Sequence, residues 1–375
     1  MKKIYLFSKI INNRFFSSLR YRLILSYIVP IACILILGTI SFIQAETAIR
    51  TNYEESLGQA LNMTGEYLLF GLNSAEESAI QLINDNNIIR YFSNYYKNDT
   101  TGAVKVLSDI KSSFINKVMT DKFIGNIYAL SGTVQSILTS KITDNEIYQN
   151  FMSTDNGKRV YENKRKTLWV GKDEYLDSKL GSANYALRLI RHFNDVDGVL
   201  IIDIKLDTVR DILSDLILAE GSLVGFVTAD KNEITVDNGI ISNENIFTDT
   251  DFFRDAYESD NTSGSEYVSF QNSKYLFMYS KIGDSNSMLC SLIPKKTITS
   301  QANSIKLITL IIVIITSIIS ITTGLFISKG IDGTIKLIIT KLKDAAKGDL
   351  TVSFRSEGVK EFENLINEIQ TPLPI

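Results

Sequence analysis

The sequence predicts an α+β protein that is anchored in a membrane by two helices. Residues 23–45 and residues 307–328 are long apolar runs without a charged side chain. Between them, helical spacing of apolar residues gives way to short apolar runs bounded by turn-forming residues, a pattern that is typical of strands. Hydrophobic residues make up 45% of the 375 residues, which fits membrane helices joined to a folded domain.

Each apolar run is long enough to cross a bilayer, because about 20 helical residues span a hydrocarbon core of about 30 Å. The first run is longer than the apolar region of a cleaved secretory signal, about 7 to 15 residues, and so predicts a retained anchor. Pro30 within it is tolerated in a membrane helix. The second run is rich in β-branched residues but much longer than a strand. We therefore predict transmembrane helices at 23–45 and 305–328.

Charge predicts the orientation. Residues 1–22 carry basic side chains and no acid, which favours a cytoplasmic N-terminus. Residues 46–304 then lie outside the cytoplasm, and the C-terminus returns to it. Because the whole chain has a net charge of −3, the acidic excess falls in the outer domain and argues against nucleic acid as a partner. Cys33 and Cys290 lie too far apart in this topology for a disulfide, and they have no zinc-site spacing.

The outer domain is expected to begin with a helical stalk over residues 46–120. Apolar residues recur in its first half at three- and four-residue intervals, namely Leu57, Leu61, Tyr67 or Leu68, Leu72, Ala75 and Ala79. Two rounds of strands follow, and each round has a hairpin, an irregular middle, late strands and an exit helix. These rounds predict a distal lobe over residues 121–218 and a membrane-proximal lobe over residues 219–300.

The end of each round carries a family resemblance. The segments GVLIIDIKLDTV and CSLIPKKTI, with the long helix before them, resemble double Cache sensor domains. The resemblance implies an extracytoplasmic domain of two PAS-like lobes behind a long N-terminal helix. A domain of this family binds a small ligand in its distal lobe.

Catalytic chemistry is poorly supplied. His192 is the only histidine, so a triad would depend on it alone, and Gly-rich phosphate loops are absent. We expect no enzymatic activity, no cofactor and no metal. An extracytoplasmic enzyme anchored by two helices is the contrasting hypothesis.

Ligand-binding chemistry is better supplied by residues 161–204, in the irregular middle of the distal lobe. Aromatic, basic and acidic side chains gather there, as a small zwitterion requires. In amino-acid-sensing double Cache domains such roles fall to residues that the resemblance places here at Tyr161, Arg165, Trp169, Tyr185 and Asp203. The chain departs from that pattern at Thr167, where the family has a basic residue. The alternative is that Trp169 belongs to the core and the charges are solvated.

The inner end shows a second resemblance. Apolar residues recur at steps of four and three from Ile331 to Ala345, which is the pattern of a coiled-coil seam, and again from Val359 to Ile369. Together with AAKGDLTVSF between them, they resemble a HAMP domain at residues 329–371. Thr334 departs from it, since many such helices have proline there. A two-helix HAMP unit needs a second copy to bury both seams, which predicts a homodimer.

The whole chain resembles the input half of clostridial-type methyl-accepting chemotaxis proteins, on the segments LRYRLILSYIVP, WVGKDEYLDSKLG and KGDLTVSF. This implies a chemosensory receptor for a small polar extracellular ligand, an amino acid or similar metabolite. A chemotaxis kinase and adaptor would be partners only if an output module is present. The input half of a sensor histidine kinase is the main alternative, and a different output, such as a cyclic-dinucleotide enzyme, is a further one. Because QTPLPI does not continue the helical seam, we expect the C-terminus to be a truncation or a frameshift scar.

Overall fold

The computed structural model describes residues 19–139, 142–143, 146–163, 166–180, 184–216, 218–237, 240–242 and 245–347. The chain divides into two compact units, Arg50–Ser300 and the segments on either side of it. The predicted connector and second helix of HAMP, like the C-terminal tail, lie outside the described residues. HAMP and the domain limits therefore stay predictions.

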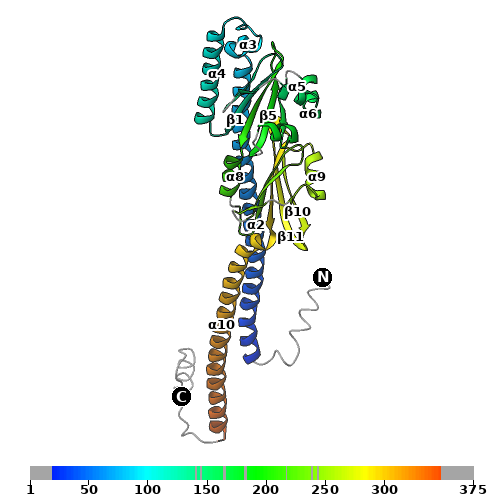
Figure 1. The fold of residues 1–375 in the computed structure, drawn as a ribbon. Helices are drawn as coiled ribbons and strands as arrows, with labels where there is room; N and C mark the ends of the chain where they lie inside the picture. The colour runs from blue at the N-terminus through cyan, green and yellow to red at the C-terminus, as the bar shows by residue number, and fades with distance from the viewer. Residues whose placement is uncertain are drawn as a thin grey trace. The chain divides into compact units, whose positions relative to one another are not determined.

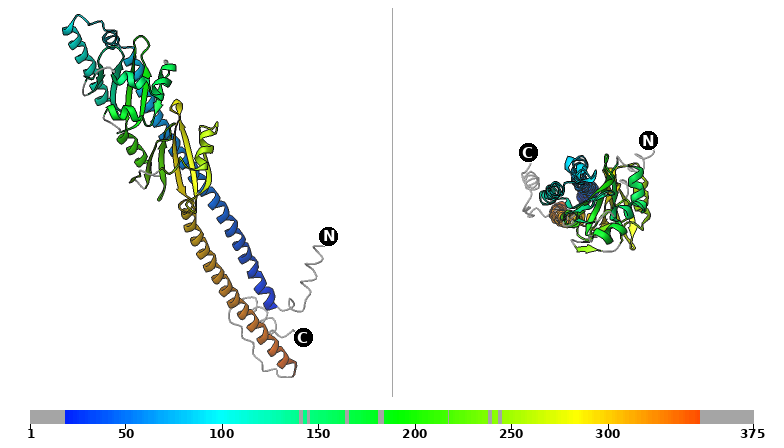
Figure 2. Two further views of the ribbon diagram at one scale, coloured as in Figure 1. Left: turned by 45° about the vertical axis from the view of Figure 1, so that its right-hand side comes forward. Right: turned by 45° about the horizontal axis from the view of Figure 1, so that its top comes forward.

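The two segments that flank Arg50–Ser300 each contain a long apolar helical stretch. One is the first part of α2 (Leu19–Ile83), and the other belongs to α10 (Lys295–Ala346). They lie side by side (Figures 1 and 2), and a Cβ atom added at Gly38 would lie 3.3 Å from Val313. Both helices are long and apolar enough to cross a membrane by length and composition. The predicted spans fall within them.

The helical stalk of unit Arg50–Ser300 is three helices rather than one. After α2 come α3 (Asn86–Phe92) and α4 (Thr100–Thr120). Asp85 caps α3 by accepting hydrogen bonds from the backbone N–H groups of Asn87 and Ile88, and Asp99 caps α4 through the N–H of Gly102. The sequence pattern predicts one helix from Glu46 to about Tyr96 and a further helix over residues 103–119. The further helix is α4, but the first prediction was wrong at Asp85, because capping aspartates favour helix starts and offer the backbone an alternative to the helix interior.

The distal lobe is built on a six-stranded antiparallel sheet, which we call sheet A, in the order β3-β2-β1-β6-β5-β4. Its strands are β1 (Ile124–Ser131), β2 (Ser136–Leu138), β3 (Ile142–Thr143), β4 (Leu168–Val170), β5 (Tyr185–His192) and β6 (Gly198–Lys205). The predicted first hairpin is confirmed by the pairing of Tyr128 with Leu138. The predicted exit helix is α8 (Leu206–Asp215), and Val209, Ile212 and Leu213 on it are buried as expected.

The proximal lobe repeats this plan in sheet B, with the order β10-β11-β12-β7-β8-β9. Its strands are β7 (Leu223–Val227), β8 (Glu233–Asp237), β9 (Ile240–Ser242), β10 (Ser263–Phe270), β11 (Ser273–Ile282) and β12 (Ser287–Pro294), with the short 3-10 turn η2 (Gly283–Ser285) before β12. In each lobe the strand that opens the lobe pairs with the strand that closes it. The predicted repetition of one strand plan is therefore present, and β12 leads directly into α10.

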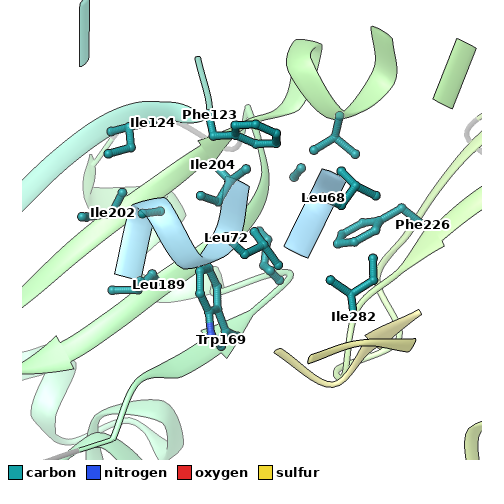
Figure 3. Close-up of a cluster of buried hydrophobic side chains, with 14 of the residues drawn as sticks. Leu68, Leu72, Phe123, Ile124, Trp169, Leu189, Ile202, Ile204, Phe226 and Ile282 are labelled. Carbon is teal, nitrogen blue, oxygen red and sulfur yellow. The ribbon is translucent and has the colours of Figure 1, made fainter. Parts of the chain in front are cut away.

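Both sheets share one hydrophobic core on α2. Leu57, Leu61, Leu68, Leu72, Ala75 and Ala79 are all buried, as the apolar spacing predicts, and Tyr67 is the exposed neighbour. Leu72 packs with Trp169, Leu189 and Ile202 of sheet A, while Leu68 lies toward Phe226 and Ile282 of sheet B (Figure 3). One helix face therefore joins the two lobes.

The opposite faces of the two sheets have separate cores. In the distal lobe, α5 (Glu146–Met152), α6 (Asp155–Glu162) and α7 (Glu174–Leu180) cover sheet A on the side away from α2 (Figure 1). In the proximal lobe, α9 (Asp251–Glu258) covers sheet B around Phe247, Phe253 and Phe277. The faces covered by these short helices are where the two lobes differ.

The close approach of α2 to the start of β1 gives a stability prediction. A Cβ atom at Gly71 would lie 2.3 Å from the ring of Phe123, which is buried at this contact. We expect Gly71→Ala to lower the free energy of unfolding by about 1–3 kcal/mol through overpacking, despite the better helix propensity of alanine. Urea unfolding followed by the fluorescence of Trp169, the single tryptophan, measures it.

Gly58→Ala is the matched control on the same helix. Its added Cβ atom would lie 3.1 Å from the terminal methyl of Met278, which is the end of a flexible side chain. We expect this variant to be neutral or slightly stabilised. Equal stability of the two variants would contradict the close packing of Gly71.

Candidate functional site

A charge pair lies inside the face of sheet A that α5, α6 and α7 cover. Strands β5 and β6 form an antiparallel hairpin in which Arg188 is directly opposite Asp203. Both residues are buried, with 0% and 1% of their surface exposed. Ile190 and Ile201, the next residues along each strand on the same face, belong to the apolar core beneath these helices.

Arg188 is held by two carboxylates and an aromatic ring. Its Nε donates to Oδ1 of Asp203 at 2.6 Å and its Nη2 to Oδ2 at 3.1 Å, a bidentate pair. Its Nη1 donates to Oδ1 of Asp177 on α7 at 2.8 Å. The ring of Tyr185 lies 4.0 Å from the guanidinium carbon, and the Tyr185 hydroxyl donates to Asp177 at 2.9 Å. We call Asp177, Tyr185, Arg188 and Asp203 the Arg188 cluster.

Helix α7 is positioned over the cluster by Asp173. The carboxylate of Asp173 accepts from the backbone N–H of Leu176 at 2.8 Å, which starts the helix, and from the side chain of Asn156 on α6 at 2.9 Å. The backbone N–H of Asp173 donates to the Tyr185 hydroxyl at 3.1 Å. The start of α7 is thus fixed both to its neighbouring helix and to the cluster.

Burial and pairing determine the charges in the cluster. Burial alone would lower the pKa of Arg188, but the hydrogen bond and charge of Asp203, together with Tyr185 and Asp177, raise the pKa above the ordinary value. Burial raises the pKa of the Asp203 carboxyl, and Arg188 partly offsets this rise. Burial is also the main reason that the pKa of Tyr185 is raised. At neutral pH Arg188 is therefore a cation, and Tyr185 is a hydrogen-bond donor.

The cluster offers both kinds of partner that a zwitterion needs. The guanidinium of Arg188 is a partner for a carboxylate, and the carboxylates of Asp177 and Asp203 are partners for an ammonium group. Within the described ranges, no group of three or more His, Cys, Asp and Glu side chains is placed to hold a metal ion. The cluster is suited to binding charged groups.

A groove of about 520 Å³ opens on α5 and α6, which cover the same face. Its lining includes Tyr148, Lys158, Tyr161, Glu162 and Asp197. The exposed ring of Tyr161 lies edge-on to the buried His192 at 6.0 Å between centroids. Tyr148 donates a hydrogen bond to Asp197, and its pKa is raised by burial first and then by that bond. The volume fits a small molecule.

The structure brings together two of the five residues that the sequence predicts for the site. Tyr185 and Asp203 lie in the Arg188 cluster, and Tyr161 lies on the separate groove. Trp169 pairs with Leu189 and faces α2, on the side of sheet A away from the cluster (Figure 3). Arg165 lies outside the described residues. The ligand-binding roles of all five stay predictions.

Thr167 also belongs to the α2 side. Its hydroxyl donates to Glu76 of α2 at 2.5 Å and accepts from Arg191 at 3.0 Å. The position at which the family resemblance expects a basic residue is therefore occupied by a contact that ties β4 to the long helix.

The interpretation of the segment from Tyr161 to the strand predicted at Asp197 as irregular was wrong, because this segment contains β4, α7 and β5. The charges of Arg188 and Arg191 interrupt the apolar pattern of β5, so the strand resembles a polar loop. Arg188 and Asp177 are the residues that sequence reasoning missed. Had β5 and β6 been recognised as a hairpin, counting residues along both strands from the turn before Gly198 would have placed Arg188 opposite Asp203.

No family model matches the chain, and no curated protein matches it. Solved structures that are similar to this chain include sensor and ligand-binding domains. One is the extracellular domain of rpHK1S-Z16, named as a candidate histidine kinase, with 11% identity and a TM-score of 0.44 over 70% of this chain and 99% of that one.

Two others were solved with small ligands. The ligand-binding domain of the Pseudomonas aeruginosa PAO1 amino acid chemoreceptor PctC, in complex with GABA, has 16% identity and a TM-score of 0.42 over 65% of this chain and 99% of that one. The ligand-binding domain of Mlp24 with asparagine has 13% identity and a TM-score of 0.39 over 68% of this chain and 99% of that one.

The Arg188 cluster predicts strong coupling between its members. We expect Arg188→Met and Asp203→Leu each to cost about 3–5 kcal/mol of unfolding free energy, because each leaves a buried charge without its main partner. The double variant Arg188→Met with Asp203→Leu is expected to cost much less than the sum. Urea unfolding measured by Trp169 fluorescence gives all three values.

The pH dependence of Arg188→Met follows from the raised pKa of Asp203. Without Arg188 the folded state holds the proton of Asp203 more tightly than the unfolded chain does, so stability rises as pH falls. We expect a smaller loss at about pH 5 than at about pH 7. Arg254→Ala, which breaks an exposed pair with Asp251, is the control and is expected to cost less than about 1 kcal/mol. Additive costs of the two cluster variants would contradict the coupling.

Proposed function

We propose that this protein is a transmembrane sensory receptor whose residues 46–304 lie outside the cytoplasm and bind a small polar ligand without changing it chemically. The observation that carries the proposal is the Arg188 cluster, a buried set of opposite charges beneath a short helix in the distal lobe. The predicted orientation, the two apolar helices and the resemblance to double Cache chemoreceptors support it.

A contribution to folding stability does not explain well why charged side chains are buried at this place. Buried ion pairs are often no more stabilising than apolar residues of similar volume. The proximal lobe shows the apolar solution, since Phe277 of β11 is paired with Leu292 of β12 and both pack in the core beneath α9. Because one lobe fills this face with apolar side chains and the other places Arg188 and Asp203 there, binding is the better explanation for the charges.

The ligand class follows from the charges. A ligand with a carboxylate and an ammonium group, such as an amino acid, would take Arg188 and the two aspartates as partners. Its entry requires that Asp177 give up its contact with Arg188, which moves α7. Binding would then change the relative populations of two positions of α7, and the rest of the domain would respond to that shift.

We further propose that the signal passes through α10 to a HAMP domain in a homodimer, and from there to a chemotaxis output. The seam residues Ile331 and Ile338 lie on α10, in a continuous helix that follows β12. The input half of a sensor histidine kinase is the alternative, and the ligand-binding role is the same in both.

A ligand screen tests the receptor function. The purified full chain in detergent is heated with amino acids, organic acids and small amines, and Trp169 fluorescence reports unfolding. We expect at least one amino acid or related zwitterion to stabilise the protein, by about 2.7 kcal/mol at a hundred times its dissociation constant. Mass spectrometry of the recovered compound is expected to show it unchanged.

The matched variants for this screen are Asp203→Asn and Asp260→Ala. The first keeps hydrogen-bonding capacity but removes the charge, and we expect it to lose the stabilisation. The second removes an exposed aspartate of the proximal lobe and is expected to retain it. A screen without a stabilising compound, or a hit that is converted to product, would contradict the proposed function.

The orientation predicts which residues a membrane-impermeant thiol reagent reaches. With both native cysteines replaced by alanine, Ser56→Cys on α2 is expected to react in intact cells, whereas Lys343→Cys on α10 is expected to react only after lysis. Both native side chains are exposed, so the difference reports their side of the membrane. Labelling of Lys343→Cys in intact cells would overturn the topology.

A further inference from the structure

The turn between β7 and β8 of the proximal lobe reaches the segment that connects β4 to α7 in the distal lobe. The carboxylate of Asp230 accepts from the backbone N–H of Gly171 at 2.9 and 3.0 Å, and from the backbone N–H of Lys172 at 2.9 Å. One side chain of the proximal lobe thus binds two successive backbone amides of the distal lobe. Hydrogen bonds to a charged group are among the stronger polar contacts in proteins.

Asp230 is held in place by its own turn. The Thr228 hydroxyl donates to Oδ1 of Asp230 at 2.6 Å, and the backbone N–H of Asn232 donates to that hydroxyl at 3.0 Å. The backbone N–H of Thr228 donates to the carbonyl of Asn232 at 2.9 Å. Lys231 adopts a φ of 65°, which closes the turn. Contacts within the proximal lobe therefore orient the carboxylate toward the distal lobe.

Gly171 is the matching feature on the distal side. A Cβ atom at this position would lie 2.3 Å from the Thr228 hydroxyl and 2.7 Å from the Cβ atom of Asn232. Glycine is required for the two backbones to approach this closely. The contact is thus shaped by residues of both lobes.

The bound amides lie next to the Arg188 cluster along the chain. Asp173 follows Lys172 directly, donates its N–H to the Tyr185 hydroxyl and starts α7. Asp177, one turn further along α7, contacts Arg188. Any movement of α7 that releases Asp177 from Arg188 therefore acts on the two amides that Asp230 holds.

On the proximal side, the same turn follows β7, which pairs with the strand that precedes α10. Strand β7 pairs with β12 from Val227 opposite Met288 to Leu223 opposite Leu292. Strand β12 ends at Pro294, where α10 begins. A short and continuous set of backbone hydrogen bonds thus joins the turn of Asp230 to the exit from the domain.

We propose that Asp230 is a positioning residue for the Arg188 cluster, and that it couples the position of α7 to the β7–β8 turn of the proximal lobe. The inference rests on the proposed function in one respect, that the Arg188 cluster is the ligand site. Because coupling between two sites is reciprocal, a change in the cluster alters the turn and a change in the turn alters α7. A contact that only adds stability would not transmit a change in either direction.

Hydrogen exchange of the full chain in detergent tests the first half of the coupling. Asp230→Ala is expected to raise amide exchange in residues 172–180 roughly threefold to tenfold, because two charge-assisted hydrogen bonds are lost. Asp230→Asn retains an acceptor oxygen and is expected to have a smaller effect, which gives a second variant if the alanine variant folds poorly. Asp260→Ala is the control and is expected to leave exchange in this segment unchanged.

A double-variant cycle tests the second half. Asp177→Asn weakens the contact with Arg188 and is expected to raise exchange in residues 228–233 by more than twofold when Asp230 is present. In an Asp230→Ala or Asp230→Asn background the same substitution is expected to add little. An unchanged turn in the Asp177→Asn protein, or an effect that persists without the Asp230 carboxylate, would overturn the coupling. Because the exchange experiment uses no ligand, its outcome can be distinguished from a failure of the ligand screen.

Discussion

The two lobes depend on a single apolar stripe of α2. Leu61 and Leu68 face sheet B, and Leu72 and Ala79 continue the same buried line along sheet A, so both sheets exclude water against one helix. Since a sheet with one solvated hydrophobic face is not stable by itself, neither lobe could keep its fold if this helix face were polar. Because one face of each sheet packs on this stripe, the two faces of a sheet have different surroundings. In sheet A the face toward α2 is packed against that helix, and the Arg188 cluster lies on the opposite face, under the short helices.

Helix α7, on that second face, is held by polar contacts as well as by apolar ones. It has seven residues, too few for a helix to persist without tertiary contacts, and its buried apolar residues are Leu176 and Leu180. Two carboxylates add polar contacts, Asp173 to Asn156 and Asp177 to Arg188. A charged ligand that competes for Arg188 therefore acts on the contact that positions this helix, while the leucines keep it near the sheet.

The stripe of α2 and the hairpins could be predicted from sequence because each depends on a local period. Apolar spacing of three and four places Leu57 through Ala79 on one helix face. The turn-forming pair Ser131-Gly132 marks the end of a strand, whichever strand pairs with it. The site depends on pairing across the sheet. The side of Trp169 is decided by the register of a three-residue strand with β5, and the burial of Arg188 is decided by Asp203 on β6. A period of two within β5 alone does not show that a charge can face the core.

The lobes are connected by two kinds of contact, and only one of them can respond to a charged ligand. The apolar contacts along α2 are non-directional and change little when a charge is added to the far face of sheet A. The Asp230 carboxylate binds the backbone amides of Gly171 and Lys172, which lie two residues and one residue before Asp173, so its geometry depends on where α7 begins. Because hydrogen bonds to these amides require specific positions, a shift of α7 must either break them or move the β7–β8 turn. The apolar stripe therefore holds the lobes together, and the polar contact at Asp230 is one whose geometry depends on the position of α7.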